Sequence, residues 1–328
     1  MSIIEQKRKI TNMIRKAKTI FLMAHKDLDL DALGSSIGMS MLLKQKRKDC
    51  YLIIDDKIHE LGVQKVLREL EGCLKIIKSE DIDKYINKRD KKNLLIILDT
   101  NKEKLVQNPN VLKKIKYKLV IDHHEQGKDL IKDACIVIDT ESSSTCEMIT
   151  DLVEYYDIDV EPYYATILLA GIVLDTNNFT LKTSSDTYYA SYYLTSLGAS
   201  ANKVQYLLKQ DIKDYTERQK LMSNIQIIND RIAFTKATPY TIYRREDLAR
   251  TADTLLFFNN IEASFVIGKI GKDTIGISAR SLGNYDISQI MVKLGGGGTT
   301  QNGAAKFENT TISKVEQELK NVLKEMGE

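Results

Sequence analysis

One histidine and three aspartates stand close together in the stretch AHKDLDLDALG, residues 24–34, directly after an apolar run. The histidine is His25, and Asp29 and Asp31 follow it. Carboxylates that lie close together repel one another and resist burial unless something compensates their charge. The stretch therefore predicts either a cation site or a solvated loop, and Asp31 could also cap the helix that follows.

Similar side chains occur where three other apolar segments end. Asp99 ends the run LLIILD, the triplet Asp122, His123 and His124 ends KLVIDHH, and Asp175 ends YYATILLAGIVLD. A single aspartate after a strand is usually a helix cap or a turn residue, and a single buried histidine usually belongs to the core. In open α/β sheets, however, the loops after the strands converge on one crevice. Taken together, these segment ends predict a metal site.

The candidate ligands offer imidazole nitrogen and carboxylate oxygen without thiolate. This set suits Mn²⁺, with Mg²⁺, Fe²⁺ and Co²⁺ as competitors. Six ligands are too many for one ion that keeps an open position, and they fit two ions that share a carboxylate. Paired ions about 3.5–4 Å apart commonly cleave phosphate esters, because they make hydroxide at neutral pH and stabilise both oxygens of an in-line displacement. The six candidates are His25, Asp29, Asp31, Asp99, His123 and Asp175.

Alternating strand-like and helix-like segments must position these side chains. Apolar runs predict strands over 19–25, 50–55, 94–99, 118–124 and 135–139, with helices over 31–46, 60–71 and 102–116. Such alternation favours a parallel sheet with right-handed crossovers. Strand-like runs return at 231–237, 263–270 and 274–281, and a closing helix is predicted over 311–326. We predict an α/β fold with a parallel-sheet catalytic domain (1–195), a helical connector (196–228) and a smaller mixed α/β domain (229–328).

Composition narrows the classes of partner and compartment. The net charge of +3 gives no strong basic field, so duplex DNA is not an expected partner. The four cysteines show no CxxC spacing, which argues against thiolate zinc and favours a reducing, cytoplasmic setting. No apolar run approaches the ~20 residues that a membrane-spanning helix needs, and the first twenty residues do not resemble a signal peptide.

The order of these motifs resembles the DHH phosphoesterase superfamily. The signature is His25-x-x-x-Asp29-x-Asp31, then Asp99, then Asp122-His123-His124, then Asp175. The second domain resembles the DHHA1 companion domain through GISARS (276–281) and LGGGG (294–298). From about residue 10 to the end, the chain is more similar to the catalytic region of GdpP-type cyclic-di-AMP phosphodiesterases than to RecJ exonucleases, family II pyrophosphatases or short oligoribonucleases.

The resemblance implies a role for each residue of the first domain. His25 and Asp29 would hold one manganese ion, Asp31, His123 and Asp175 would hold the other, and Asp99 would bridge the two. His124 would contact the scissile phosphate or orient a neighbour. Asp122 would accept a hydrogen bond from behind the imidazoles and set their tautomer. Asp27 receives no role.

The resemblance also implies a substrate-binding set in the second domain. Arg280 could bind a phosphate bidentately, and Gly295, Gly296, Gly297 and Gly298 would let backbone N–H groups approach the ligand. Asn302 matches a family asparagine, whereas Thr299 stands where relatives usually carry histidine. Because threonine carries no charge and does not stack on a base, we expect the substrate affinity or base preference of this chain to differ from that of its relatives. The hydroxyls of SSST (142–145) could face the cleft, although a helix cap is the simpler interpretation.

The implied reaction is hydrolysis of cyclic-di-AMP to linear pApA, by attack of metal hydroxide on phosphorus and departure of the ribose 3′ oxygen. Related substrates are alternatives: linear dinucleotides, cyclic-di-GMP, a 3′-phosphoadenosine nucleotide or short oligoribonucleotides. A catalytically inactive nucleotide sensor is a further alternative, to which Thr299 gives some support. Relatives often pair, so a homodimer is expected. Full-length relatives carry membrane helices ahead of this region, so the chain is either an excised catalytic region or a relative without an anchor.

Overall fold

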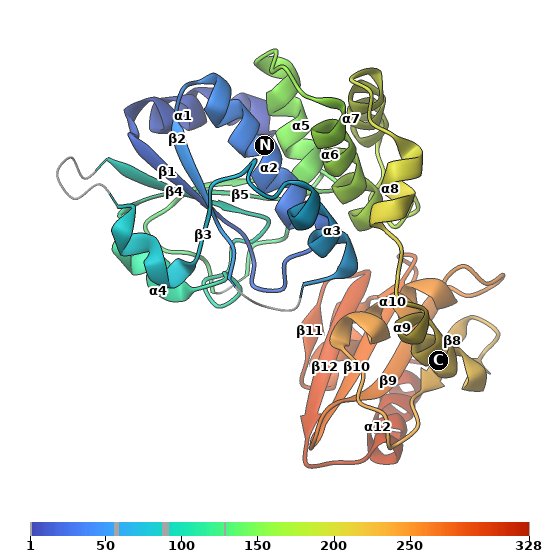
Figure 1. Ribbon diagram of the computed structural model, residues 1–328. Coiled ribbons are helices and arrows are strands. Elements are labelled where there is room, and N and C mark those ends of the chain that lie inside the picture. The colour runs from blue at the N-terminus through green and yellow to red at the C-terminus, as the bar shows by residue number, and fades with distance from the viewer. Residues whose placement is uncertain (1, 56–58, 87–91, 128, 328) are drawn as a thin grey trace. The chain divides into compact units, whose positions relative to one another are not determined.

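The computed structural model describes residues 2–327 except 56–58, 87–91 and 128 (Figure 1). The chain forms two compact units, Met1–Lys209 and Gln210–Glu328. The division lies inside the connector predicted over 196–228, so helix α8 (Ala201–Leu207) belongs to the first unit and helix α9 (Ile212–Leu221) to the second. Each unit has its own hydrophobic core.

A six-stranded sheet forms the centre of the first unit, with the order β3-β2-β1-β4-β5-β6. Every neighbouring pair runs parallel, as predicted. The two central strands, β1 and β4, are buried along their whole length. Their nearly continuous apolar sequences fit a parallel sheet that is covered on both faces. The strands are β1 (Thr19–Met23), β2 (Asp49–Ile53), β3 (Ile76–Ile77), β4 (Asn93–Leu98), β5 (Tyr117–Asp122) and β6 (Cys135–Ile138).

The two faces of this sheet carry separate cores. Ile20 and Leu22 of β1 pack with the helices α1, α2, α5 and α6, whereas Phe21 and Met23 pack on the other face with Val111 of α4. Helix α2 lies against both α5 and α6, so it is buried on nearly every side. Besides α8, the described helices of this unit are α1 (Ile3–Lys16), α2 (Leu30–Gln45), α3 (Leu61–Glu69), α4 (Pro109–Lys114), α5 (Thr145–Tyr155), α6 (Pro162–Asp175) and α7 (Ser185–Ser196), with the 3₁₀ helix η1 (Ser79–Lys84).

The prediction of a helix over 102–116 is wrong for the first half of that range. Only α4 is helical there, and Val106 instead forms a β-bridge with His25. Asn108 caps α4 by accepting a hydrogen bond from the N–H of Asn110, and Pro109 occupies the first turn. Proline favours that position and disfavours a helix interior, so the chain can begin a helix at Pro109 but cannot run one through it.

The second unit contains a mixed six-stranded sheet in the order β11-β12-β10-β9-β8-β7. Only β8 and β9 pair in parallel among the described strands, and the other pairs are antiparallel. This confirms the predicted mixed domain. The strands are β7 (Gln226–Ile228), β8 (Ile232–Lys236), β9 (Ala263–Gly271), β10 (Thr274–Ser281), β11 (Gly297–Gly298) and β12 (Asn302–Glu308). The remaining helices are α10 (Arg245–Leu255), α11 (Ile287–Lys293) and α12 (Ile312–Glu325), with η2 (Met222–Asn224).

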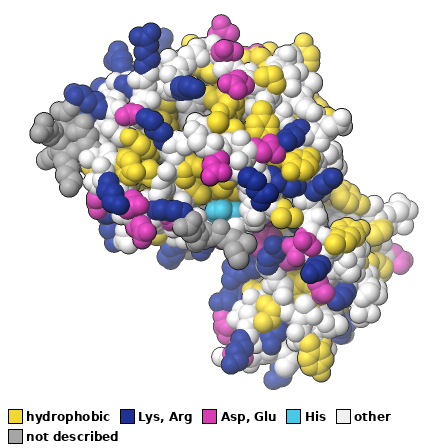
Figure 2. Space-filling model, in the orientation of Figure 1, with side chains coloured by type: hydrophobic (Ala, Val, Ile, Leu, Met, Phe, Trp, Pro, Cys, Tyr) yellow, Lys and Arg dark blue, Asp and Glu magenta, His cyan; other side chains and the backbone are white. Residues whose placement is uncertain are grey.

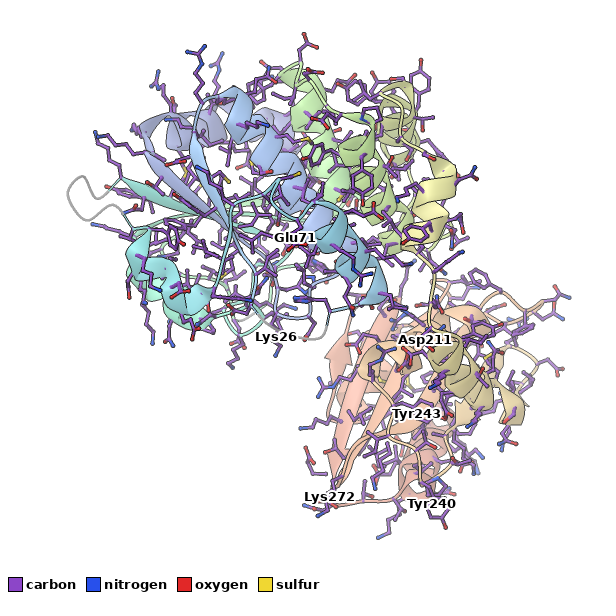
Figure 3. The ribbon with its side chains drawn as sticks, in the orientation of Figure 1. Lys26, Glu71, Asp211, Tyr240, Tyr243 and Lys272 are labelled. Atoms are coloured by element: carbon purple, nitrogen blue, oxygen red, sulfur yellow. The ribbon has the colours of Figure 1, made fainter. Side chains whose placement is uncertain are left out.

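Charged side chains of both signs are interspersed over the face shown in Figure 2. Side chains fill the interior of each unit (Figure 3): Tyr243 is buried in the second unit, whereas Tyr240, three residues earlier, is almost fully exposed. Every helix among the described residues is too short or too polar to cross a bilayer.

Candidate metal centre

The loop after β1 brings His25 and Asp29 together at the start of α2. Asp29, not Asp31, caps this helix: its Oδ1 accepts hydrogen bonds from the N–H groups of Asp31 (3.0 Å) and Ala32 (2.9 Å). The interpretation of Asp31 as the cap is therefore wrong, because the helix begins one residue before it. Oδ2 of Asp29 lies 3.6 Å from Nε2 of His25 and so remains available to a ligand.

Asp31 lies in the first turn of α2 with its carboxylate fully buried. Its Oδ2 accepts a hydrogen bond from the N–H of Thr145 (2.8 Å), and its Oδ1 accepts one from the N–H of Cys146 (2.7 Å). Burial raises the pKa of Asp31 well above its ordinary value, and the charges of Asp99 and Asp175 raise it further. The carboxylate therefore sits where negative charge is in excess, which a cation would relieve.

Asp99 follows β4 in the left-handed backbone region, with φ of 61°. Few residues other than glycine adopt this conformation, and such positions are frequent at functional sites. Its two carboxylate oxygens face different partners. Oδ2 lies 3.3 Å from Nε2 of His25, whereas Oδ1 lies 3.6 Å from Nε2 of His123 and 3.7 Å from Nδ1 of His124. Asp99 thus lies between two groups of ligands, where a bridging carboxylate would be placed.

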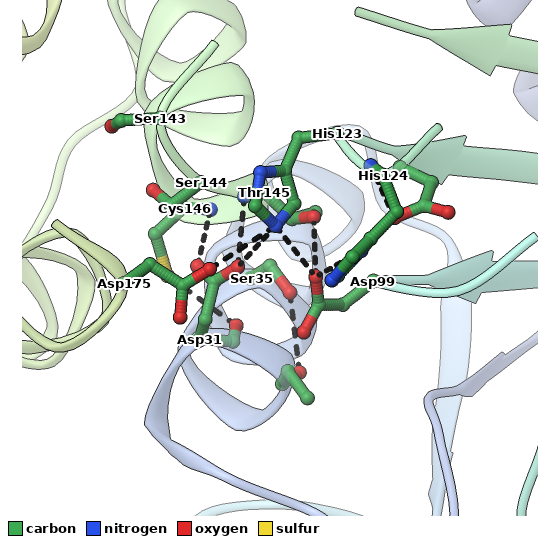
Figure 4. A network of polar contacts seen from close by, with 12 residues as sticks. Asp31, Ser35, Asp99, His123, His124, Ser143, Ser144, Thr145, Cys146 and Asp175 are labelled. Carbon is green, nitrogen blue, oxygen red and sulfur yellow. Dashed lines mark hydrogen bonds and ion pairs between the residues drawn. The ribbon is translucent and has the colours of Figure 1, made fainter. Parts of the chain in front are cut away.

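His123 follows β5 and is surrounded by carboxylates (Figure 4). Its Nε2 lies 3.1 Å from Oδ2 of Asp175 and 4.0 Å from Oδ2 of Asp31. Neither ring nitrogen has a partner in hydrogen-bond geometry among the described residues, although both are buried. A buried imidazole without a hydrogen bond is costly in a finished fold. Its position among three carboxylates fits a nitrogen that ligates a cation.

His124 differs from its neighbour because about half of its side chain is exposed. Its Nδ1 lies 2.8 Å from Oδ1 of Asp122, which also accepts a hydrogen bond from the His124 N–H at 3.2 Å. Asp122 therefore contacts one of the two imidazoles, and the expectation that it serves both is not met. Its other oxygen is buried and has no hydrogen-bond partner among the described residues. The contact turns Nε2 of His124 away from Asp122.

The charges of the centre influence one another strongly. Burial lowers the pKa of His25, but the hydrogen bonds and charges of Asp29 and Asp99 outweigh it and raise the pKa to about 11. Burial also lowers the pKa of His123, but the close contact with Asp175 and the charges of Asp99 and Asp122 outweigh it and raise the pKa to about 9. Without a cation the aspartates thus favour protonated imidazoles, so binding a metal here would release protons.

Ligand atoms gather in three overlapping groups, in each of which all atoms lie within 4.8 Å of one another. One group contains His25, and the other two contain His123. All six ligands predicted from the sequence belong to at least one of the three groups. The groups are His25, Asp29 and Asp99; Asp31, His123 and Asp175; and Asp99, His123 and His124. The first two groups match the two ligand sets that the family resemblance implies, and Asp99 links the first to the third. The donor set and its spacing fit two divalent ions.

Two further side chains brace this centre: Thr145, one of the SSST hydroxyls that could face the cleft, and Asn101, which sequence reasoning missed. Thr145 donates a hydrogen bond from its hydroxyl to Oδ1 of Asp99 at 2.9 Å. Asn101 donates from its side-chain amide to the backbone oxygen of His124 at 3.1 Å and so holds the loop after β5. The motif SSST signalled hydroxyls near the cleft, but only the fold shows that Ser144 caps α5 and that Thr145 faces the aspartates.

Arg280 in the second unit is engaged by its own domain. Its Nε donates to Oδ1 of Asp253 at 2.7 Å, and its Nη1 donates to the backbone oxygen of Ala279 at 2.9 Å. In the pairing of β10 with β12, Arg280 stands opposite Asn302. The described contacts thus orient the guanidinium and bring two predicted substrate-binding residues together.

The glycine run forms one side of a hairpin. A Cβ at Gly296 would clash with the backbone of Ala304, and one at Gly298 would clash with the backbone of Asn302. Thr299 closes the turn: its N–H donates to the Asn302 oxygen (2.7 Å), and its Oγ1 accepts from the Asn302 N–H (3.1 Å). Gly295 has φ of 74°, whereas Gly297 has open space where a Cβ would lie. Backbone packing alone accounts for Gly296 and Gly298.

Two regions of the chain match family models: residues 19–172 match the DHH family, N-terminal domain, and residues 229–328 match the DHHA1 domain. The cyclic-di-AMP phosphodiesterase GdpP of Geobacillus thermodenitrificans is 36% identical over 321 residues, covering 96% of this chain and 48% of that protein. The cyclic-di-AMP phosphodiesterase PdeA of Listeria monocytogenes is 35% identical over 314 residues, covering 94% and 48%. The chain thus spans about half the length of these relatives.

The fold is also similar to that of a solved structure, an exopolyphosphatase-related protein from Bacteroides fragilis. The TM-score is 0.77 at 21% sequence identity, and the alignment covers 98% of this chain and 97% of that one. With both domain models matched in order and the parallel and mixed sheets in place, the chain belongs to the DHH family and carries a DHHA1 domain after its DHH domain.

Proposed function

We propose that this chain is a two-metal phosphodiesterase that opens cyclic-di-AMP to linear pApA. One observation carries the proposal: the two carboxylate oxygens of Asp99 face two different groups of histidine and aspartate ligands. In this proposal His25 and Asp29 would hold one ion, Asp31, His123 and Asp175 would hold the other, and Asp99 would serve both. Two divalent ions, when bound, lower the pKa of a water molecule and offset the charge that develops on a phosphate.

His124 is placed to contact the substrate. Asp122 holds its Nδ1 at 2.8 Å, and about half of the side chain is exposed, so Nε2 is the atom left to reach a phosphate oxygen. Because the Asp122 carboxylate only accepts, Nδ1 carries a proton, and Nε2 can donate to a phosphate oxygen only when the imidazole is protonated. Burial lowers the pKa of His124, but the hydrogen bond to Asp122 and the charge of Asp99 outweigh it and raise the pKa, which favours that form. Asp122 thereby acts through His124 and not on the substrate itself.

Arg280 supplies the phosphate contact of the second unit in this proposal. The carboxylate of Asp253 fixes its Nε, and Nη2 has no hydrogen-bond partner among the described residues. A guanidinium held along one edge presents its remaining N–H groups with little loss of side-chain entropy. The open position of Gly297 in the neighbouring hairpin gives backbone N–H groups a second approach to a ligand.

The choice of cyclic-di-AMP rests on the two relatives that are 35–36% identical over nearly the whole chain. The test is a substrate panel with purified protein and Mn²⁺, followed by chromatography of the products. The panel holds cyclic-di-AMP, cyclic-di-GMP, linear pApA, a 3′-phosphoadenosine nucleotide and a short oligoribonucleotide. We expect cyclic-di-AMP to give pApA with the highest kcat/KM. Faster turnover of another member would reassign the substrate, and absence of turnover with every member at saturating Mn²⁺ would contradict an enzymatic function.

The identity of the metal is tested separately. We expect elemental analysis of protein loaded with excess Mn²⁺ and then desalted to show two ions per chain, since two complete ligand groups are present. Mg²⁺, Fe²⁺ and Co²⁺ are compared in the same assay. A single ion per chain at saturation would contradict the bridging role of Asp99.

A further inference from the structure

The first residue of helix α5 has a hydroxyl that the helix does not need. Ser144 caps α5, accepting a hydrogen bond from the N–H of Glu147 at 3.0 Å. The next residue, Thr145, is fully buried, and its hydroxyl donates to Oδ1 of Asp99 at 2.9 Å. Farther along the same helix, the hydroxyl of Thr150 makes the ordinary helical contact, donating to the backbone oxygen of Cys146 at 2.7 Å. Thr145 therefore departs from the usual local bonding of a helical threonine.

The same residue also holds a second aspartate of the centre. The N–H of Thr145 donates to Oδ2 of Asp31, and the N–H of Cys146 donates to Oδ1. These are backbone donors at a helix amino terminus, where the partial positive charge favours a carboxylate. Helix α5 thus fixes Asp31 through its backbone and Asp99 through a side chain, so one helix end orients carboxylates from both ligand groups.

Close packing fixes the position of this helix end. A Cβ at Gly171 of α6 would clash with Sγ of Cys146 and would lie 3.0 Å from Cα of Asp31. A Cβ at Gly34 of α2 would lie 2.8 Å from the same sulfur. Glycines on two neighbouring helices therefore let α5 approach closely, and little space is left for Thr145 to shift.

The hydroxyl also determines how Asp99 is turned. Apart from Thr145, the side-chain partners of Asp99 among the described residues are imidazoles, which would turn to the cations once these are bound. Thr145 is then the donor that remains on Oδ1 and keeps Oδ2 directed at the His25 group. We infer that Thr145 is a positioning residue that sets the affinity of the centre for divalent cations. The inference rests on the proposed two-metal function.

The experiment compares Thr145→Val with Thr145→Ser in the full chain. Valine keeps the shape and removes the hydroxyl, whereas serine keeps the hydroxyl. Removing a residue that orients a metal ligand typically costs about 10- to 100-fold in affinity. Mn²⁺ is titrated into metal-free protein by calorimetry, and we expect binding that is weaker by about this factor for Thr145→Val and near the parent value for Thr145→Ser.

Thr150→Val is the matched control, because it removes an equally buried hydroxyl from the same helix without touching an aspartate. We expect its Mn²⁺ affinity to equal that of the parent. Equal affinities for Thr145→Val and Thr150→Val would overturn the inference, as would a failure of Thr145→Ser to restore binding. If Thr145→Val does not fold, Thr145→Ala is titrated with the same expectation. Parent-like Mn²⁺ affinity in Thr145→Val, together with loss of affinity and turnover in Asp99→Asn, would reject the role of Thr145 and leave the proposed function standing.

Discussion

The metal centre of the first unit and the glycine hairpin of the second differ in how far the fold alone explains their residues. In the hairpin, Gly296 and Gly298 avoid backbone clashes and Thr299 closes the turn. In the centre, both ring nitrogens of the buried His123 lack a hydrogen-bond partner among the described residues, and burial and neighbouring carboxylates raise the pKa of Asp31. A fold gains nothing from such an arrangement by itself. The comparison shows that buried polar groups which the fold leaves without compensation support a site that the sequence motif had already located.

The largest expected loss of activity comes from Asp99→Asn, which tests the metal centre. Asparagine lacks the negative charge and one of the two oxygens that would serve the two ions, which removes several kcal/mol of transition-state stabilisation, so we expect turnover of cyclic-di-AMP to fall by at least about 10³-fold. Asparagine tolerates the left-handed backbone of Asp99, so the fold should be retained.

The measurement is product formation at saturating Mn²⁺, with a thermal unfolding curve of the metal-free protein. Asp27→Asn in the neighbouring loop is the control, because Asp27 is exposed and belongs to none of the ligand groups. Retained turnover in Asp99→Asn would refute the assignment of two metals.

A pair of glycine substitutions tests the hairpin side. A methyl group at Gly296 would clash with the Ala304 oxygen and lie 2.7 Å from Cα of Ala305, so Gly296→Ala should lower the stability of the chain by roughly 1–3 kcal/mol. Gly297→Ala places its methyl in open space and should change stability by less than about 0.5 kcal/mol. Urea denaturation followed by circular dichroism checks both.

The same pair also separates packing from binding. If Gly297→Ala leaves stability unchanged but raises KM, then Gly297 contacts the ligand. The glycine segment 295–298 would then serve both backbone packing and ligand binding. Equal stability of the two variants would contradict the structural explanation of Gly296.

Arg280→Lys should have a smaller effect, confined to substrate binding. Lysine cannot contact Asp253 and a phosphate in the fork geometry of a guanidinium, so we expect KM to rise by about tenfold with kcat nearly unchanged. Mn²⁺ affinity should stay at the parent value. Arg231→Lys, at an exposed arginine paired with Glu262, is the conservative control. A fall in kcat without a change in KM would place Arg280 in the reaction step instead of in binding.

No effect on metal binding is expected from a last substitution, at an acidic group of the first unit that lies outside the ligand groups. Burial raises the pKa of Asp151 in α5 to about 7, and the neighbouring acids Glu147, Asp186, Glu154 and Asp139 add to the shift. The folded state therefore holds this proton more tightly than the unfolded state, and stability falls as the pH rises from about 4 through 7.

Asp151→Asn should remove this loss of stability with rising pH, because asparagine does not ionise. We expect the variant to be more stable than the parent at pH 8, by a few kcal/mol at most, and to differ little at pH 4. Thermal unfolding at the two pH values measures the difference, and Mn²⁺ affinity should not change. A gain of the same size at pH 4 would show that Asp151 destabilises the fold for a reason other than its charge.

Much of the centre was predictable because its residues lie at element ends that sequence patterns mark well. Apolar runs located the strands before Asp99 and His123 to within about two residues, and the parallel order of the sheet brings such ends together. The long apolar helix that ends at Asp175 was equally clear.

What the sequence could not provide depends on contacts between distant segments. Ser144 and Thr145 are both plausible caps, and only the approach of α5 to α2 shows which hydroxyl reaches Asp99. The choice of His124 over His123 as the partner of Asp122 depends on side-chain direction at the end of β5. Strand β12 was missed because its glycine and alanines are poor strand formers, and its pairing with β10 overrides that preference.

The left-handed backbone at Asp99 limits which residues can replace this aspartate during evolution. Glycine, asparagine and aspartate adopt that conformation with the least strain, so few replacements at this position leave the backbone undisturbed. A related chain that keeps this architecture without the carboxylate should therefore carry glycine or asparagine here. A larger or branched residue would instead mark a chain whose central strand had been rebuilt.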